Sequence, residues 1–184
     1  MQLANEEISV IDNLIEQLKH CSDDQQRIQI IAQLKIDLND LGAYHYFGEK
    51  SYGRNLIFSN NDFEVILMCW SAGQGTIVHD HSESLCVMQC VAGELDEQRY
   101  IEQSSKEEVK FKIKPSQMST LTRGETCSIT DQDGLHSIKN NSTSAACSLH
   151  FYFPPIHNVT LYNLQEGVKN TVSGVFTSEY GVLK

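Results

Sequence analysis

The chain has 184 residues, of which 40% are hydrophobic and 21% are charged, and its formal net charge is −10 at pH 7. This length suits one domain with a sizeable core, and this composition is that of an ordinary globular protein. The excess of 24 acidic over 14 basic side chains argues against a nucleic-acid partner and against an anionic membrane surface, because both favour a basic patch.

Neither a signal peptide nor a membrane span is predicted. The first twenty residues contain Glu6, Glu7, Asp12 and Glu16 and lack an unbroken apolar core. No apolar run approaches the roughly 18 residues that a membrane helix needs. The six cysteines include no CxxC pair, so we expect reduced, mostly buried thiols in a cytoplasmic protein.

Two amphipathic helices are predicted at the start of the chain. Apolar residues recur at helical spacing over residues 5–20. Ser22 with Gln25 forms a capping-box pattern that opens a second helix, and Gly42 ends it. We expect the helical segment over residues 1–42 to bury its apolar faces on the outside of a sheet.

From residue 44 onward the sequence predicts short strands separated by turn signals, such as Asn60-Asn61-Asp62 and Gly73-Gln74-Gly75. Many short strands at close spacing are typical of a sandwich or a barrel. The predicted strands cover residues 52–58, 63–69, 76–79, 86–91, 94–100, 107–112, 117–121, 127–130, 136–139, 145–153, 159–163 and 168–176. We therefore expect a single domain over residues 1–184, with a β-barrel over residues 44–184.

The strongest chemical signal is the triplet His79-Asp80-His81. On a strand, residues at i and i+2 point to the same side of the sheet, so the two imidazoles could bind one divalent metal ion. A lone histidine is more often structural, but a His-x-His pair favours a metal site. His136, in Gly134-Leu135-His136, could complete the ligand set.

Two other predicted strands place polar side chains on one face. Tyr52 and Arg54 are at i and i+2, and Ser148, His150 and Tyr152 are at i, i+2 and i+4. Either set alone could be the solvated face of a sheet. Apolar residues alternate cleanly with the second set, which favours a polar interior at one end of a small barrel.

The spacing then resembles the cupin pattern. Gly73 precedes His79 by five intervening residues, and His136 with Asn140 gives the H-x3-N of a second cupin motif. In most cupins a Glu follows the His-x-His pair and provides a carboxylate ligand. The equivalent position here is Cys86.

That substitution narrows the resemblance to cysteine dioxygenase, a thiol dioxygenase family of the cupin superfamily. The matching segments are YGRN at 52–55, HDHSESLC at 79–86, GLH at 134–136 and SLHFYFPP at 148–155. The helical start and the strand-rich tail also fit, so the resemblance covers nearly the whole chain. It implies a mostly β fold, a small jelly-roll-like cupin barrel with an N-terminal α-helical layer.

By this resemblance, His79, His81 and His136 hold a mononuclear iron, Fe(2+). The family's Arg that binds the substrate carboxylate matches Arg54, with Tyr52 nearby. The implied reaction oxidises L-cysteine with O2 to cysteine sulfinic acid. We expect a monomer whose partners are only this small substrate and O2.

The resemblance also implies the remaining catalytic residues. The family's Ser-His-Tyr relay matches Ser148, His150 and Tyr152. In animal-type members, a Cys is joined to that Tyr by a thioether, and Cys86 occupies its place. This chain is therefore similar to the members that can form the Cys86–Tyr152 crosslink.

Charge balance explains why this chemistry suits these residues. A carboxylate ligand would lower the positive charge at the ion, whereas three neutral imidazoles leave the ion its full charge. A thiolate substrate can therefore supply the anionic ligand. Arginine suits the carboxylate because its planar fork can donate to both oxygens. Arg27 lies on the second predicted helix, and Arg99 and Arg123 fall near strand ends or loops, which leaves Arg54.

Other functions stay open at this point. A related dioxygenase could use 3-mercaptopropionate or cysteamine. Mercaptopropionate enzymes typically place a Gln where Arg54 stands, and cysteamine has no carboxylate for Arg54 to bind. A non-catalytic metal-binding cupin and a zinc hydrolase-like site with three His ligands are the remaining alternatives.

Overall fold

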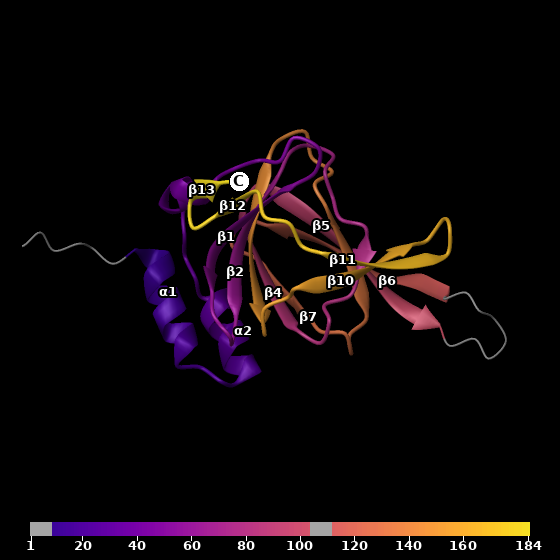
Figure 1. Cartoon of the computed structure of the whole chain (residues 1–184), viewed down its shortest axis with the longest axis horizontal. Helices are drawn as coiled ribbons and strands as arrows, with labels where there is room; N and C mark the ends of the chain where they lie inside the picture. The colour runs from indigo at the N-terminus through magenta and orange to yellow at the C-terminus, as the bar shows by residue number, and fades with distance from the viewer. Residues whose placement is uncertain (1–8, 104–111) are drawn as a thin grey trace, which may run out of the picture.

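Two β-sheets pack against each other in the computed structural model of the protein, which describes residues 9–103 and 112–184 (Figure 1). In chain order, the strands are β1 (Gly53–Ser59), β2 (Glu64–Trp70), β3 (Val78–His79), β4 (Leu85–Ala92), β5 (Glu94–Gln103), β6 (Lys112–Thr122), β7 (Thr126–Ile129), β8 (Leu135–Lys139), β9 (Ala146–Phe153), β10 (Asn158–Asn163), β11 (Val168–Ser173), β12 (Ser178–Glu179) and β13 (Val182–Leu183). The larger sheet has the order β13-β12-β1-β2-β9-β4-β7, and the smaller sheet has the order β11-β10-β3-β8-β5-β6.

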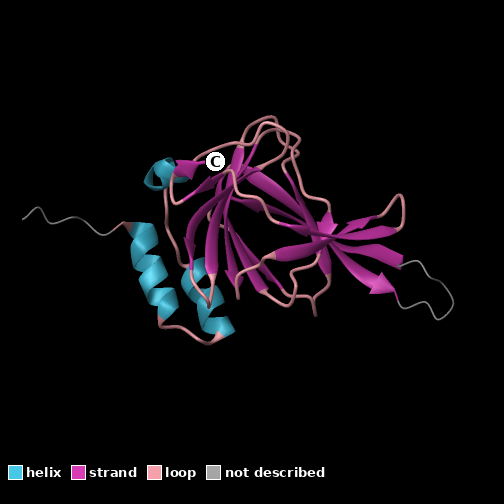
Figure 2. Cartoon of the chain, in the orientation of Figure 1, coloured by secondary structure: helices cyan, strands magenta, loops and turns pink. Residues whose placement is uncertain are grey.

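The helices α1 (Val10–Lys19) and α2 (Asp24–Ala32) and the 3-10 helix η1 (Leu38–Tyr44) lie beside the larger sheet (Figure 2). Alternation along the central strands gives this sheet two apolar faces. Leu67 and Phe151 point outward and share a core cluster with Leu14 of α1. Met68 points inward and shares a second cluster with Leu95 of the smaller sheet. The mostly β fold with an N-terminal helical layer is thus confirmed.

The start of the second predicted helix is one residue later than expected. Asp23, not Ser22, is the N-cap of α2, because its carboxylate accepts the backbone N–H of Gln26 at 2.8 Å. The capping box assigned to Ser22 and Gln25 is therefore wrong.

The expected end of that helix at Gly42 is also wrong. α2 ends at Ala32, and a separate 3-10 helix follows. The Asp37 carboxylate accepts from the Asn39 N–H at 3.0 Å, and the Asp40 carboxylate accepts from the Asp37 N–H at 3.0 Å. This second capping box starts a new helical turn, inside which Gly42 lies.

The predicted strands mostly agree with the observed ones to within a few residues. The predicted strand over 107–112 lies almost entirely outside the described residues, and the one over 117–121 is part of the longer β6. The strand predicted over 168–176 ends at Ser173. Two short strands were not predicted, and the first of them, β12, pairs in parallel with β1.

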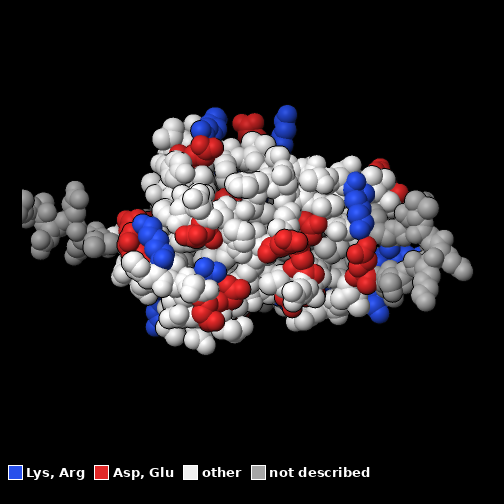
Figure 3. All heavy atoms as spheres, turned by 60° about the horizontal axis from the view of Figure 1, so that its bottom comes forward, with Lys and Arg blue, Asp and Glu red and all other residues white. Residues whose placement is uncertain are grey.

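The surface agrees with the acidic composition. On the face shown in Figure 3, Asp and Glu side chains gather near the middle, and Lys and Arg side chains lie apart from one another. In the part of the chain that the structure describes, no helix is both long enough and apolar enough to cross a bilayer.

Candidate functional site

Three imidazoles meet on the smaller sheet. His79 of β3 and His136 of β8 are direct partners across the two antiparallel strands. Possible ligand nitrogens of His79, His81 and His136 lie within 4.8 Å of one another. The structure thus brings together the three histidines that the sequence singled out. The expectation that both members of the His-x-His pair lie on a strand holds for His79 only, because β3 ends there.

An aspartate holds His81 in place beyond the end of β3. The two carboxylate oxygens of Asp131 accept the backbone N–H groups of His81 and Glu83, each at 2.7 Å. Ser82 and Glu83 adopt positive φ angles of 47° and 67°, which turn the chain back sharply. Asp131 stabilises this turn, and so keeps the His81 ring beside the other two.

Hydrogen bonds fix which ring nitrogens can bind a metal. The Nδ1 of His79 lies 2.9 Å from the carbonyl of Ile77, and the Nδ1 of His136 lies 2.9 Å from Oε1 of Glu97. Since both partners are acceptors, each Nδ1 must carry the proton. The Nε2 of each ring is then a free lone pair, as a metal ligand requires.

The imidazoles are neutral. Burial is the main cause that lowers the pKa of His79, and it lowers the pKa of His81 and His136 well below the ordinary value. The neighbouring histidines lower the pKa of the latter two further, because adjacent positive charges would repel. Proton competition at these nitrogens is therefore weak at neutral pH.

The donor set fits a divalent metal ion that favours nitrogen ligands. The Nε2 atoms of His81 and His136 lie 3.1 Å apart. Two nitrogens bonded to one ion at about 2.1 Å and at a right angle would be about 3.0 Å apart.

Glu97 was not predicted from the sequence, although it orients His136. Its other oxygen accepts from Arg99 Nε at 3.0 Å, and Arg99 also donates to the Ser128 carbonyl at 2.7 Å. The placement of Arg99 near a strand end is wrong, because it lies within β5 directly opposite His136. A sequence signal existed: Leu95 is apolar, so Glu97 and Arg99 at i+2 and i+4 share its inward face.

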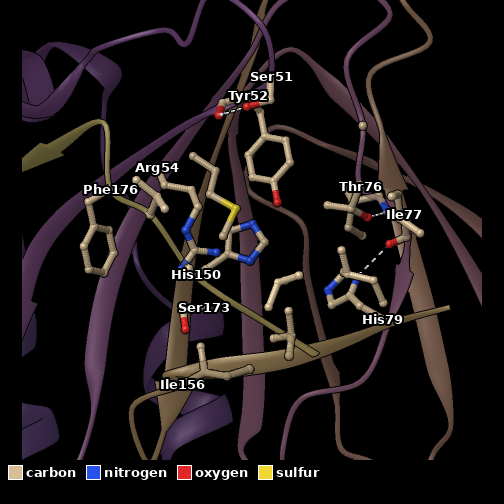
Figure 4. Close-up of a pocket in the computed structure, with 18 of the residues that line it drawn as sticks. Ser51, Tyr52, Arg54, Thr76, Ile77, His79, His150, Ile156, Ser173 and Phe176 are labelled. Carbon is tan, nitrogen blue, oxygen red and sulfur yellow. Dashed lines mark hydrogen bonds between the residues drawn. The ribbon is translucent and has the colours of Figure 1, made fainter. Parts of the chain in front are cut away.

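A pocket of about 440 Å³ lies beside the imidazoles. Of the residues that the sequence singled out, it is lined by Tyr52, Arg54, His79, His136, His150 and Tyr152. Figure 4 shows the side chains of Arg54 and His150 close together, with His79 across the pocket from them. His81, Ser148 and Cys86 are not among the lining residues. Residues 172–177 form another part of the wall, which was not predicted from the sequence.

Arg54 has an unused donor at this pocket. In the described part of the chain, its Nε is buried and has no hydrogen-bond partner. Its guanidinium carbon lies 5.5 Å from the centre of the Phe176 ring. A Cβ on Gly174 would lie 2.9 Å from Nη2 of Arg54, so the glycine leaves room for this side chain. The site is thus equipped to bind an anionic group.

A chain of hydrogen bonds leads to the Tyr152 hydroxyl. Trp70 donates its indole N–H to Oγ of Ser148 at 2.9 Å, and this Oγ lies 2.9 Å from Nε2 of His150. The Nδ1 of His150 lies 3.3 Å from the Tyr152 oxygen. The relay residues predicted from the sequence therefore do meet, and Trp70 extends the chain.

The protons in this series of hydrogen bonds can be assigned by counting donors. Trp70 can only donate. If the Ser148 hydroxyl donates to Nε2 of His150, then Nδ1 carries the proton and donates to Tyr152. The Tyr152 O–H is then available to donate either to Sγ of Cys86, with which Tyr152 is hydrogen-bonded, or to a group bound in the pocket that Tyr152 lines. The reverse order would leave the fully buried Ser148 hydroxyl without an acceptor, which is costly.

The relay is uncharged. Burial, followed by the positive charge of Arg54, lowers the pKa of His150 to about 3. Burial raises the pKa of Tyr152 well above its ordinary value. At neutral pH, His150 is therefore a neutral ring and Tyr152 keeps its phenolic proton.

Cys86 lies on β4 directly opposite Tyr152 on β9. Cβ atoms of directly opposed residues are about 4.5–5.5 Å apart. Burial raises the pKa of the Cys86 thiol well above the ordinary value, although its hydrogen bond with Tyr152 acts in the opposite direction. Cys86 is thus a neutral thiol beside the phenol.

Comparison with known sequences gives a family match over most of the chain. The family model described as cysteine dioxygenase type I matches residues 3–165. The cysteine dioxygenase type 1 of Danio rerio is 34% identical over 137 residues, which are 73% of this chain and 67% of that protein. The Homo sapiens protein of the same name is 31% identical over 157 residues, which are 83% of this chain and 76% of that protein.

Comparison with solved structures shows the fold. A Klebsiella pneumoniae protein with a double-stranded β-helix domain matches with a TM-score of 0.51 at 14% identity, over 69% of this chain and 95% of that one. A Thermus thermophilus protein matches with a TM-score of 0.51 at 20% identity, over 65% of this chain and 99% of that one. The fold is that of the cupins.

The Glu97–His136 contact gives a first prediction. We expect Glu97→Gln to weaken metal binding by about 10–100-fold, because the variant loses the charge that strengthens the hydrogen bond to Nδ1. Glu94→Gln is the matched control, since Glu94 is exposed on the same strand. Metal content after dialysis against a graded chelator measures the effect. Equal retention by the two variants would show that Glu97 does not support the site.

Proposed function

The chain belongs to the cysteine dioxygenase type I family, a family of non-haem iron dioxygenases, and on this premise we propose that it oxidises L-cysteine with O2 to cysteine sulfinic acid. Arg54 is the main support for this proposal. Its buried Nε has no hydrogen-bond partner among the described residues, and its side chain lines a pocket that two of the three clustered histidines also line. A substrate for this pocket should present both a carboxylate and a metal-binding group.

We assign the metal to Fe(2+), held by His79, His81 and His136. A ferrous ion there would supply the redox chemistry that O2 needs and the Lewis acidity that favours the substrate thiolate. The protein keeps the three ligands neutral by burial, so the anionic charge at the ion is left for the substrate.

Arg54 binds the carboxylate in this proposal. Its planar guanidinium can donate to both carboxylate oxygens, which fixes the orientation of the amino acid relative to the imidazoles. Tyr52 lines the same pocket and stacks on Trp70 with ring centroids 4.4 Å apart. Tyr52 is therefore held as a rigid wall next to the substrate.

Tyr152 acts as the hydrogen-bond donor to the bound substrate. The proton assignment leaves its O–H available as a donor at the pocket that Tyr152 lines, and the raised pKa keeps that proton in place at neutral pH. His150 and Ser148 orient the phenol through the bonds described above. Their role is to position Tyr152 and to hold His150 in one tautomer.

Cys86 tunes Tyr152 through a thioether. In this proposal, a bond forms between Sγ of Cys86 and the ring carbon next to the Tyr152 hydroxyl, and two hydrogen atoms are lost to O2. Their direct pairing across β4 and β9 supports it. The bond would fix the ring and adjust the acidity of the phenol.

The carboxylate requirement disfavours cysteamine, which would leave Arg54 without a partner. 3-Mercaptopropionate has a carboxylate but lacks the amine, which in L-cysteine is a further possible ligand for the ion. A non-catalytic cupin would not need the Arg54 and Tyr152 donors at one pocket. L-Cysteine is therefore the substrate that uses the most groups of this site.

We propose that the chain forms one domain and works as a monomer in the cytoplasm. The helices and the larger sheet share one apolar cluster, which supports a single folding unit. All six cysteines lie in the described residues and are free, which suits a reducing compartment.

Arg54 provides the test of the substrate assignment. We expect Arg54→Ala to raise the KM for L-cysteine by about 10–100-fold, since a hydrogen bond to a charged group contributes about 1.5–3 kcal/mol. Iron content should be unchanged, because Arg54 is not a ligand. Arg123→Ala is the control, as Arg123 is exposed and paired with Asp37, and neither residue lines the pocket. An unchanged KM in Arg54→Ala would refute carboxylate binding by this residue.

The thioether can be tested by mass. Enzyme that has turned over should be lighter than the sequence mass by about two hydrogen atoms. Cys86→Ala and Tyr152→Phe should each restore the mass expected for their sequences. Cys127→Ala is the matched control, because this second thiol on a neighbouring strand should not affect the loss. A full mass in turned-over wild-type enzyme would exclude the bond.

A further inference from the structure

A second group of metal-ligating side chains lies on the outer face of the larger sheet. Cys69 of β2 and Cys147 of β9 are direct partners across the antiparallel pair. His45, the residue that follows η1, lies beside them. Possible ligand atoms of these three residues lie within 4.8 Å of one another.

The sheet separates this group from the three clustered histidines. Along β2 and β9, Met68 belongs to the inward cluster, whereas Cys69 and Cys147 belong to the outward cluster under the helices. Ser148 also faces inward, where it contacts His150. The outer group therefore shares no ligand with the catalytic site proposed above.

The spacing suits one tetrahedral ion. The Nε2 of His45 lies 3.4 Å from Sγ of Cys147. A zinc ion with a Zn–S bond of about 2.3 Å and a Zn–N bond of about 2.05 Å would hold those two atoms about 3.6 Å apart. Directly opposed cysteines have Cβ atoms about 4.5–5.5 Å apart, so both sulfurs can reach the same ion.

The three side chains differ in burial, which leaves one side of the group open to solvent. Cys69 and Cys147 are buried, whereas His45 is only partly buried. The Asn55 amide lies 3.6 Å from Sγ of Cys69, toward which it donates an N–H. Solvent at His45 can supply water as a fourth ligand.

His45 is held near the sulfurs by its chain neighbour. The Asn55 amide, fully buried on β1, donates to the Tyr46 carbonyl at 2.9 Å and to the Leu67 carbonyl at 3.1 Å. The Tyr46 hydroxyl donates to the Gly181 carbonyl at 3.2 Å. The imidazole therefore needs little further ordering to bind an ion.

We propose that His45, Cys69 and Cys147 form a binding site for a thiophilic divalent cation, with Zn²⁺ as the ion that fits best. Zinc favours nitrogen and sulfur ligands in tetrahedral sites. Binding replaces the two thiol protons, which pass to solvent, and the two thiolates balance the charge of the ion. The ion fastens the segment between η1 and β1 to the centre of the larger sheet.

This segment leads into the catalytic site, since Tyr52 and Arg54 follow it directly. A bound ion should stabilise the fold, because it binds the native arrangement of three residues that are distant in sequence. The iron site is not needed for this effect. The zinc site can therefore be tested separately from the proposed dioxygenase activity.

Metal titration of the full-length, iron-loaded protein tests the site. We expect one further equivalent of Zn²⁺ to bind and to raise the temperature of thermal unfolding. Co²⁺ used as a probe should give a sulfur-to-cobalt charge-transfer band, since the three-histidine site has no cysteine ligand. Cys69→Ser and Cys147→Ser should lose the band and the extra equivalent. His45→Ala should weaken zinc binding by at least about tenfold, because loss of a mere hydrogen-bond partner of a ligand already costs about 10–100-fold.

Cys90→Ser is the matched control, because Cys90 is a buried thiol of the same sheet on its inward side and should leave both signals unchanged. If the cysteine variants do not fold, His45→Ala tests the proposal alone, since His45 is only partly buried and lies outside the helices and strands. The absence of a second equivalent in wild-type protein would overturn the site, as would a cobalt band that persists in Cys147→Ser. A Cys69–Cys147 disulfide, seen as a mass loss of about two hydrogens that a reductant reverses, would also overturn it.

Discussion

The antiparallel register of β1, β2, β9 and β4 is the constraint on which the proposed site depends. It pairs Arg54 with Met68, Met68 with Ser148, and Cys86 with Tyr152. Because side chains alternate, a slip of one residue would turn this whole set to the other face of the sheet. The same register places Cys69 and Cys147 together on the outer face. One pairing pattern therefore produces both the inner polar pocket and the outer thiol pair.

The inner site is built for an anionic ligand. Its three imidazoles and the His150 ring are neutral because they are buried, and Arg54 contributes a positive charge with an unused donor. A divalent ion would add two further positive charges. Glu97 does not cancel them, because it is already paired with Arg99 and with the far side of His136. A thiolate and a carboxylate on one small molecule would therefore complement this charge.

Local pattern was enough to predict the residues that face the pocket from a single strand. Alternation indicated Tyr52 with Arg54 and the relay on β9, and the His-x-His triplet with His136 indicated the metal centre. Partners supplied by other segments were not predicted. Glu97, Asp131 and the wall at residues 172–177 act through contacts between strands and loops that are distant in sequence. The break between α2 and η1 was missed because the capping by Asp37 outweighs a helical pattern that continues through it.

Oxygen consumption by the iron-loaded protein with each of three thiols is the most direct measurement of thiol dioxygenase activity and of substrate choice. We expect rapid O2 uptake with L-cysteine, one O2 consumed for each cysteine sulfinic acid formed, and a lower kcat/KM with 3-mercaptopropionate. Cysteamine should react poorly, because it cannot engage Arg54. An absence of thiol-dependent uptake would contradict the assignment as a dioxygenase. A higher kcat/KM with either competing thiol would contradict the assignment of L-cysteine as substrate.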